Sequence, residues 1–142
     1  MKLNIRKFKL KDEEEVIDLW RACGLVVPWN NPHLDIQRKL KVQPELFLVG
    51  CLEGRLIASV MAGYEGHRGW VNYLAVHPDY QRRGIGRSMM ERVEQLLLTM
   101  GCPKINLQVR KTNQGVINFY QEIGFRDDNV IGMGKRLIKD EL

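Results

Sequence analysis

The chain has 142 residues, of which 44% are hydrophobic and 27% are charged. This balance predicts one globular domain over residues 1–142, and no run reaches the ~20 apolar residues that span a bilayer, which excludes a membrane-spanning chain. The formal net charge of +5 favours an anionic partner. Composition leaves open whether that partner is nucleic acid, a membrane surface or a phosphorylated cofactor.

The chain has three cysteines, Cys23, Cys51 and Cys102, which lie far apart in the sequence. Their odd number and their spacing fit neither a complete disulfide set nor a metal site, so we expect buried, reduced thiols in a cytoplasmic protein. Residues 1–11 are charged and give no signal peptide. The last four residues match the retention signal of the endoplasmic reticulum, which a protein without a signal peptide cannot use, so we interpret this match as a coincidence.

The N-terminal part of the chain predicts one strand and two helices. Alternating apolar residues indicate a strand over Leu3–Phe8. A helix follows Asp12, which we expect to be its N-cap with Glu15 as the capping-box partner, and this helix ends at Gly24. A second helix is expected over His33–Val42, before a proline.

Three strands are predicted in the middle of the chain. Leu46–Leu52 and Arg55–Ala62 flank a Glu-Gly turn and therefore form a hairpin. The next strand is Trp70–Val76, and it leads into a proline-containing turn at His77–Tyr80.

The C-terminal half predicts two helices and two further strands. One helix begins near Gly84, and another is capped by Asn113 and runs to Ile123. Strands are expected over Lys104–Val109 and Ile131–Ile138. Because helices and strands are interleaved, we predict a mixed α/β fold. The helix that begins near Gly84 carries an apolar stripe at helical spacing, made of Ile85, Met89, Val93, Leu96, Leu97 and Met100.

The start of the helix near Gly84 predicts an anion-binding site. Backbone N–H groups at a helix N-terminus have no partner within the helix and carry a positive potential. Gly84 and Gly86 have no side chain that would keep an anion from these groups. We therefore expect a phosphate or pyrophosphate as the ligand. Fixed positive charge is added by Arg82, Arg83 and Arg87.

Two other phosphate-binding motifs are excluded at this position. The Gly-Lys-Ser/Thr end of a P-loop is absent, and Met89 stands where a dinucleotide fingerprint has its third glycine. A glycine-containing loop with a solvated basic face is the alternative interpretation. The preceding strand and turn, the arginines and the long amphipathic helix together favour anion binding.

At these residues the sequence resembles the GNAT acetyltransferase superfamily, which has a Gln/Arg-x-x-Gly-x-Gly/Ala signature. Among its members, bacterial enzymes that acetylate protein N-termini look most similar. The matching segments are Gln81–Gly86, Leu74–Pro78, Asn113, Phe119–Tyr120 and Gly124–Phe125.

The resemblance implies a mixed, mostly antiparallel sheet that splays at Val76, with helices on both faces. It also implies acetyl-coenzyme A as the donor, no metal, and direct transfer of the acetyl group to a primary amine. The expected partner is a small-molecule amine or a peptide, not nucleic acid or a membrane, and the expected state is a monomer or a homodimer.

The resemblance further implies which residues hold the cofactor. The strand residues Leu74, Ala75 and Val76 would line the pantetheine arm, with the backbone of the first and last pairing with it. Asn113 would contact the cofactor from the opposite side, and Tyr120 would lie near the sulfur. The pyrophosphate would be held by the loop and helix start, made of Gln81, Arg82, Arg83, Gly84, Ile85, Gly86, Arg87 and Ser88.

Acyl transfer from a thioester needs a proton for the leaving thiolate, and Tyr120 is the candidate acid. Its alternative role is that of a core aromatic, since Ile117 and Ile123 share its helix face. A buried tyrosine needs a partner for its hydroxyl in either role.

The general base is not evident. Related N-terminal acetyltransferases carry Glu where Gln108 stands, and an amide cannot take up a proton near neutral pH. Glu65 and His67 are candidate substitutes, but exposed loop residues of this kind commonly have no catalytic role. Bulk water reached through a chain of carbonyls is a further alternative.

The apolar segment Leu25–Pro32 lies where the resemblance places the acceptor. Trp29 could stack on a substrate chain, or the segment could simply cover the core. Two other function classes stay open: a non-catalytic coenzyme-A-binding module, and a basic nucleic-acid-binding protein. The second is weak, because the aromatic residues do not alternate with basic ones as a stacking platform requires.

Overall fold

The computed structural model describes residues 2–140, and they form two compact units. The first unit comprises residues 2–106 and Asp140, and the second is Leu107–Lys139. The single domain expected from the sequence stays a prediction. Within residues 2–140, no helix has the length and apolar character needed to cross a membrane.

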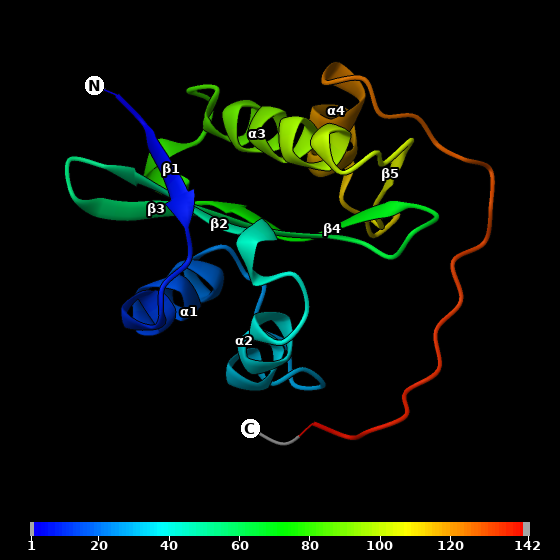
Figure 1. The fold of residues 1–142 in the computed structure, drawn as a ribbon, viewed down its shortest axis with the longest axis horizontal. Helices are drawn as coiled ribbons and strands as arrows, with labels where there is room; N and C mark the ends of the chain where they lie inside the picture. Colours follow the sequence, from blue (N-terminus) through cyan, green and yellow to red (C-terminus); the bar gives the residue numbers. More distant parts are fainter. Residues whose placement is uncertain (1, 141–142) are drawn as a thin grey trace. The chain divides into compact units, whose positions relative to one another are not determined.

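A five-stranded sheet forms the centre of the first unit (Figure 1). Its strand order is β1-β2-β3-β4-β5; the first three pairings are antiparallel and the last is parallel. This confirms the predicted mixed, mostly antiparallel sheet. The strands are β1 (Asn4–Lys7), β2 (Phe47–Leu52), β3 (Arg55–Tyr64), β4 (Gly69–Val76) and β5 (Ile105–Asn106).

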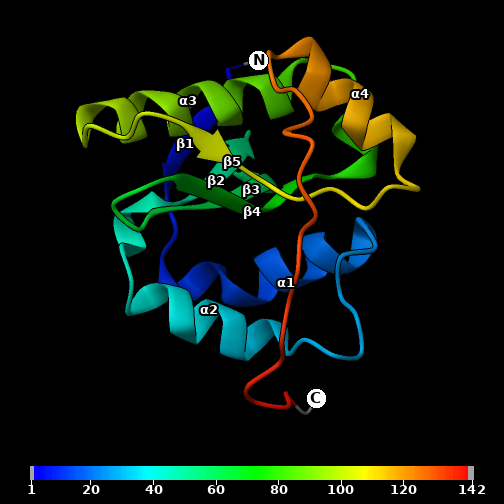
Figure 2. The same ribbon diagram turned by 90° about the vertical axis from the view of Figure 1, so that its right-hand side faces the viewer.

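Helices cover both faces of this sheet, as predicted. Helices α1 (Glu13–Ala22) and α2 (Pro32–Leu40) lie on one face, and α3 (Ile85–Thr99) lies on the other (Figure 2). Short 3₁₀ turns, η2 (Pro44–Leu46) and η3 (Pro78–Tyr80), precede β2 and follow β4.

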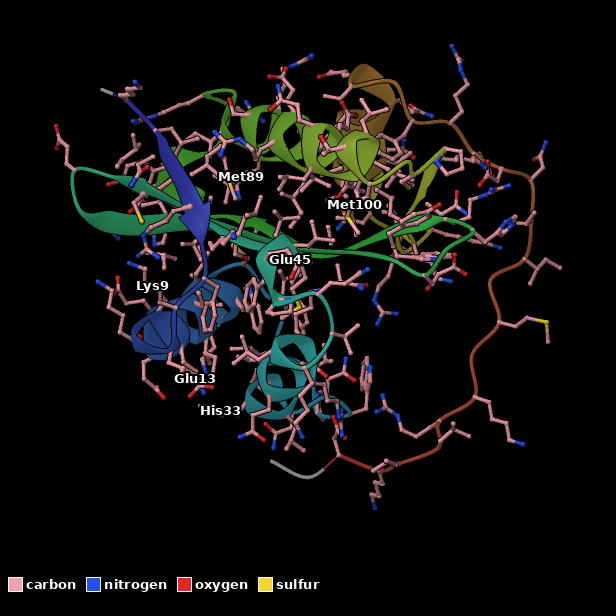
Figure 3. The ribbon with its side chains drawn as sticks, in the orientation of Figure 1. Lys9, Glu13, His33, Glu45, Met89 and Met100 are labelled. Carbon is pink, nitrogen blue, oxygen red and sulfur yellow. The ribbon has the colours of Figure 1, made fainter. Side chains whose placement is uncertain are left out.

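The two faces have different cores. On the α1 face, Phe47 of β2 stacks on Phe8 with ring centroids 4.3 Å apart, and Trp20 of α1 is fully buried. On the α3 face, the predicted stripe is buried at Ile85, Met89, Val93 and Leu97, whereas Leu96 is half-buried. Figure 3 shows Met89 on this side of the sheet. Met100 is not part of it, because α3 has ended and its side chain is 39% exposed.

Helix α3 packs closely on β2 because β2 has a glycine beneath it. A Cβ atom at Gly50 would lie 3.0 Å from the sulfur of Met89 and 3.1 Å from the Cβ of Ala58. Such distances are below normal van der Waals contact, so this position accepts no larger side chain without movement of its neighbours.

Asp12 stands before α1 as expected, but the predicted capping box with Glu15 is wrong. The Asp12 side chain makes no cap hydrogen bond to α1. It accepts two hydrogen bonds from Arg6, at 2.7 and 2.9 Å, and one from the backbone N–H of Lys9 at 2.8 Å. A bidentate guanidinium is a stronger partner than a free backbone N–H, which explains the difference.

This ion pair gives a testable pH dependence. The Arg6 guanidinium, with the N–H of Lys9, holds the pKa of Asp12 below its usual value despite burial. The pair therefore stabilises the fold above the unfolded pKa of ~3.9, and this stability is lost as pH falls through the folded pKa. We expect Asp12→Asn to lower the free energy of unfolding by about 2–3 kcal/mol at pH 7, measured by urea denaturation.

The difference between wild type and Asp12→Asn should shrink as the pH falls from ~3.9 through the lowered folded pKa of Asp12. The exposed Asp18, replaced by asparagine, is the matched control and should change stability by less than about 0.5 kcal/mol. A deficit of the Asp12 variant that stays constant from pH 7 to pH 2 would contradict the assignment.

Two sheet features differ in extent from the predictions. The parallel ladder joins only Gly69 to Ile105 and Trp70 to Asn106, so β5 is shorter than the predicted Lys104–Val109. The sheet therefore splays after Trp70, closer to the start of β4 than Val76. Beyond Trp70, the outer edge of β4 has no strand partner within residues 2–140.

The second unit contains α4 (Gln114–Glu122). Asn113 caps it as predicted, its side-chain oxygen accepting a hydrogen bond from the N–H of Val116 at 3.2 Å. The helix ends before Gly124, whose φ of 103° favours glycine.

The strand predicted over Ile131–Ile138 does not form, and this prediction is wrong. Its alternating pattern satisfies the period of a strand, but a strand also needs a neighbour for its backbone, and no ladder within residues 2–140 includes it. Its apolar side chains are accordingly exposed, up to 90% for Met133.

Candidate active site

The loop between β4 and α3 is held in a defined shape. The ring nitrogen Nδ1 of His77 accepts a hydrogen bond from the N–H of Asp79, and the carbonyl of His77 accepts one from Tyr80 at 2.8 Å. Arg82 and Gly84 then both adopt left-handed φ angles, 64° and 75°. This sharp turn places Gly84 as the N-cap of α3.

The N-terminus of α3 is open to solvent. Gly84 is exposed, and a Cβ built on it would meet no atom within 4 Å outside its neighbours. The Ser88 hydroxyl donates to the carbonyl of Gly84 at 3.1 Å, and this bond uses none of the backbone N–H groups of the turn. The first N–H groups of the helix therefore remain unpaired within it and carry the positive end of the helix dipole.

The arginines around this terminus are exposed, as an anion site requires. Arg83 lies over the ring of Tyr80 at 5.3 Å, and Arg55 lies 5.4 Å from the same ring. Arg82 and Arg87 take part in none of the ion pairs found within residues 2–140. Their charge is thus available, and the residues present fit a phosphate or pyrophosphate group.

The free edge of β4 leads directly to this terminus. The N–H of His77 donates to the carbonyl of Ile57 on β3, and Val76 pairs opposite Ala58. Since successive residues of a strand direct their backbone groups to opposite sides, Leu74 and Val76 direct theirs to the splayed edge. An extended, amide-containing arm can pair with these groups.

Part of that edge is already occupied. The carbonyl of Val76 accepts hydrogen bonds from the side-chain amide of Gln81 at 3.0 Å and from the thiol of Cys23 at 3.3 Å. The side chain of Gln81 thus ties the loop between β4 and α3 to the end of β4. Ala75, between the two pairing residues, is buried and directs its backbone to β3.

All three cysteines are free thiols. Cys51 and Cys102 are buried as predicted, whereas Cys23 is half-buried.

A bulge interrupts β4 just before Leu74. The register with β3 shifts between Ser59 and Met61, and Tyr73 adopts a left-handed φ of 54°. Trp20 stacks on the Tyr73 ring with centroids 3.8 Å apart, and its Nε1 donates to Ser59, whose hydroxyl donates to the carbonyl of Tyr73. A strained residue held by two buried side chains is typical of a functional site. No local pattern pointed to Tyr73, because its partners come from α1 and β3.

Glu65 is a poor candidate for the general base. Its carboxylate accepts hydrogen bonds from the backbone N–H groups of His67 and Arg68 in one tight turn. These N–H groups hold the pKa of Glu65 below its usual value, which makes it a weaker base. Gln108 belongs to the second unit, where its side-chain amide lies against Gly132. A Cβ atom added to Gly132 would lie 2.8 Å from Nε2 of Gln108, so the glycine leaves room for this amide.

Tyr120 is buried in the second unit, with 9% of its surface exposed. Its ring makes edge contacts with Phe119 and Phe125, at centroid distances of 5.1 and 5.4 Å. Burial raises the pKa of Tyr120 to about 12, so its hydroxyl is protonated at neutral pH, as an acid requires.

The segment between α1 and α2 divides into two parts. Leu25 and Val26 pack on the core of the α1 face. Trp29 is 51% exposed, and both of its expected roles, stacking on an acceptor and covering the core, stay predictions.

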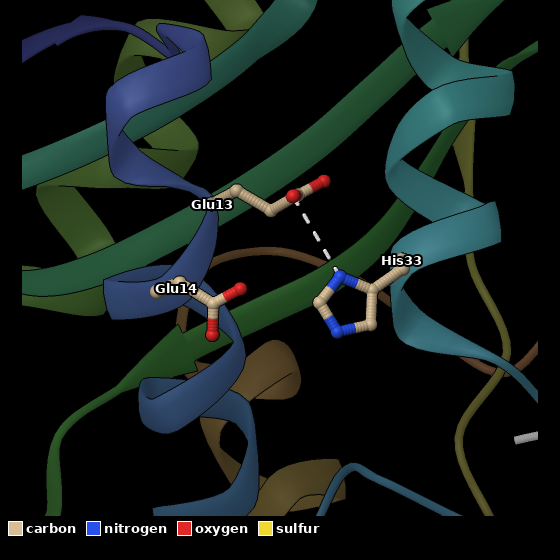
Figure 4. Close-up of side chains that lie close together, drawn as sticks. All are labelled: Glu13, Glu14 and His33. Carbon is tan, nitrogen blue, oxygen red and sulfur yellow. Dashed lines mark ion pairs between the residues drawn. The ribbon is translucent and has the colours of Figure 1, made fainter.

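A further group of titratable side chains lies between the starts of α1 and α2 (Figure 4). Possible ligand atoms of Glu13, Glu14 and His33 lie within 4.8 Å of one another, and Nδ1 of His33 is 3.7 Å from Glu13. The group is at the surface, where exposed acidic residues often gather without an ion, and no other feature of the described residues points to a metal there.

Comparison with known proteins places this architecture in a family. Residues 13–125 match the family described as Acetyltransferase (GNAT) family. The chain belongs to the GNAT family of acetyltransferases. It is 49% identical over 140 residues to an acetyltransferase of Sodalis glossinidius (strain morsitans), covering 98% of this chain and 99% of that one.

Solved GNAT structures share the fold at low sequence identity. The PaiA N-acetyltransferase from Thermoplasma acidophilum, in complex with coenzyme A, has a TM-score of 0.74 at 20% identity, covering 93% of this chain and 94% of that one. A ribosomal-protein-alanine N-acetyltransferase from Escherichia coli has a TM-score of 0.76 at 22% identity, covering 90% and 80%. The family and the full-length relative establish this protein as an acetyltransferase, and so favour the enzyme over a non-catalytic module.

Proposed function

We propose that the protein is a cytoplasmic N-acetyltransferase that passes the acetyl group of acetyl-coenzyme A directly to a primary amine. The observation that supports this most is the splayed edge of β4 running into the open, arginine-rich N-terminus of α3. The GNAT neighbour crystallised with coenzyme A supports the choice of cofactor.

The chain's own residues would hold the cofactor as follows. The backbone of Leu74 and Val76 binds the pantetheine amides at the free edge of β4. The N–H groups from Arg82 to Gly86, with Arg87 and Ser88, hold the pyrophosphate at the helix N-terminus. Asn113 adds a contact through the amide nitrogen that its capping bond leaves unused.

Acetyl-coenzyme A supplies a thioester, and the chain supplies a proton donor. Tyr120 donates the proton that the departing thiolate needs, since its hydroxyl is protonated at neutral pH. No metal takes part in this scheme. We propose a single GNAT-like domain, as a monomer or homodimer, whose acceptor is a peptide or a small amine rather than nucleic acid or a membrane.

The acceptor is predicted to be an α-amine rather than a lysine side chain. At pH 7 an α-amine of pKa ~8 is about a tenth neutral, whereas a lysine amine of pKa ~10.4 is neutral in fewer than about one molecule in 1,000. This favours the α-amine by a factor on the order of 10². The Escherichia coli neighbour named for acetylating an alanine agrees with this choice.

The test is a matched pair of peptides, one with only its N-terminus free and one with only a lysine free. Initial rates with acetyl-coenzyme A should favour the first peptide across pH 7 to 9, and the ratio should narrow as pH rises because the lysine gains neutral amine. Faster acetylation of the lysine peptide over this range would refute the α-amine preference.

A further inference from the structure

A network of charged side chains surrounds the bulge of β4 on the α2 side. The hydroxyl of Tyr73 donates to Oδ2 of Asp35, on α2, at 2.6 Å. Arg38, one turn further along α2, donates two hydrogen bonds to Asp140 at 3.1 and 2.9 Å. The same guanidinium lies 3.5 Å from Oδ1 of Asp35. All four residues belong to the first unit.

The network leaves Asp35 with free capacity to bind a proton donor. Arg38 is committed to Asp140, because that contact is bidentate and shorter, and the Asp140 side chain is almost fully buried. The Asp35 side chain is 23% exposed, and each of its oxygens can accept a further hydrogen bond. Since the closer partner of Arg38 is Asp140, the Asp35 carboxylate keeps a negative charge that attracts a cation.

Tyr73 orients Asp35 without competing with it as a base. Burial and the neighbouring Asp35 carboxylate raise the pKa of Tyr73 well above its usual value. Its hydroxyl therefore stays protonated and donates to the carboxylate. The ring is fixed in turn by its stacking on the buried Trp20.

Under the proposed function, the thioester lies near this carboxylate. If the pantetheine arm pairs with Leu74 and Val76, and its phosphates lie at the start of α3 beyond Val76, the thioester end points towards the preceding residue, Tyr73. Asp35 is hydrogen-bonded to that residue. An amine that approaches the thioester from the α2 side meets the Asp35 carboxylate.

We propose that Asp35 is the general base of the transfer: it binds the acceptor ammonium and takes its proton. One N–H proton passes to the carboxylate, and the freed lone pair forms a bond to the acetyl carbon. The C–S bond then breaks with its electron pair on sulfur. Tyr120 gives its proton to the thiolate and regains one from water. The second proton that leaves the nitrogen passes to water, and Asp35 also releases its proton to water, so that one proton is released overall.

This inference rests on the proposed function, and its test uses two acceptors that differ in one property. The first is a peptide with only its α-amine free; the second is the same peptide with an aminooxy group in that place, whose nitrogen is already neutral at pH 7. Asp35→Asn keeps an oxygen that can accept the Tyr73 hydrogen bond but cannot take a proton.

For Asp35→Asn we expect kcat to fall by about 10²–10⁴ with the amine peptide and by less than about tenfold with the aminooxy peptide. The melting temperature and the calorimetric affinity for coenzyme A should be unchanged. Asp35→Glu, which retains a carboxylate, should recover part of the lost rate. Asp18→Asn removes the same charge from an exposed position on the neighbouring helix and should have no effect.

Two outcomes would overturn the inference. An equal loss of kcat with both acceptors would show that Asp35 has a structural role, and an unchanged kcat with both acceptors would exclude Asp35 as the base. If wild type acetylates neither peptide, a peptide α-amine is not the acceptor, and that part of the proposed function fails. The amine peptide is then titrated by calorimetry in the presence of coenzyme A, which needs no turnover. If Asp35→Asn binds the amine peptide at least about tenfold more weakly than wild type does, Asp35 is supported as the ammonium site. If wild type and Asp35→Asn bind the peptide equally, or if neither binds it detectably, the inference is overturned.

Discussion

Replacing Gly86 with glutamate is expected to abolish measurable binding of acetyl-coenzyme A, a loss of at least about 100-fold in affinity. Gly86 is the second residue of α3, beside the exposed Gly84, where the first N–H groups of the helix have no partner. The new side chain would fill the space proposed for the pyrophosphate and bring a carboxylate towards its negative charge.

The fold should survive this change, which makes the result interpretable. An acidic side chain in the first turn of a helix interacts favourably with the helix dipole, so α3 itself is not weakened. The variant should therefore unfold at nearly the wild-type temperature while calorimetry shows no binding.

Gly134→Glu is the matched control for the Gly86 variant. It makes the same change in charge and size at an exposed glycine where an added Cβ meets no atom within 4 Å. This control should bind acetyl-coenzyme A normally. If a folded Gly86→Glu protein binds as well as wild type, the α3 terminus does not hold the pyrophosphate.

The features that could be predicted from the sequence are those set by neighbouring residues. The apolar stripe of α3 needed only helical spacing, and four of its members are buried. The hairpin between β2 and β3 followed from a Glu-Gly turn, and Glu53 and Gly54 both adopt left-handed φ angles of 49° and 79°. The phosphate loop is equally local, since its strand, turn and helix start are consecutive in the chain.

The features that could not be predicted depend on partners far away in the sequence. Tyr73 meets Asp35 across 38 positions, and Arg38 meets Asp140 across 102. No periodicity indicates such pairs, and neither Asp35 nor Tyr73 carries a local motif. The failed strand over Ile131–Ile138 is the converse case, because its pattern is local while the pairing it needs is not.

Removing the hydroxyl of Tyr120 with Tyr120→Phe is expected to lower kcat by about 10²–10⁴, the usual contribution of a positioned acid. With a pKa of about 12, the hydroxyl is protonated at any pH from 6 to 9, so it can donate its proton to a departing thiolate throughout this range. The affinity for acetyl-coenzyme A should change little, because the ring contacts with Phe119 and Phe125 do not involve the hydroxyl.

Stability separates this role from that of a core aromatic. Within residues 2–140, no hydrogen bond of the Tyr120 hydroxyl is found, so its loss leaves no buried partner unpaired. Tyr120→Phe should therefore unfold within about 0.5 kcal/mol of wild type. Tyr64→Phe, which removes a hydroxyl bonded to the exposed carbonyl of Gly66, is the control and should keep full turnover. Near-normal turnover of Tyr120→Phe on a true acceptor would mean that Tyr120 only packs, and that the thiolate takes its proton from another donor.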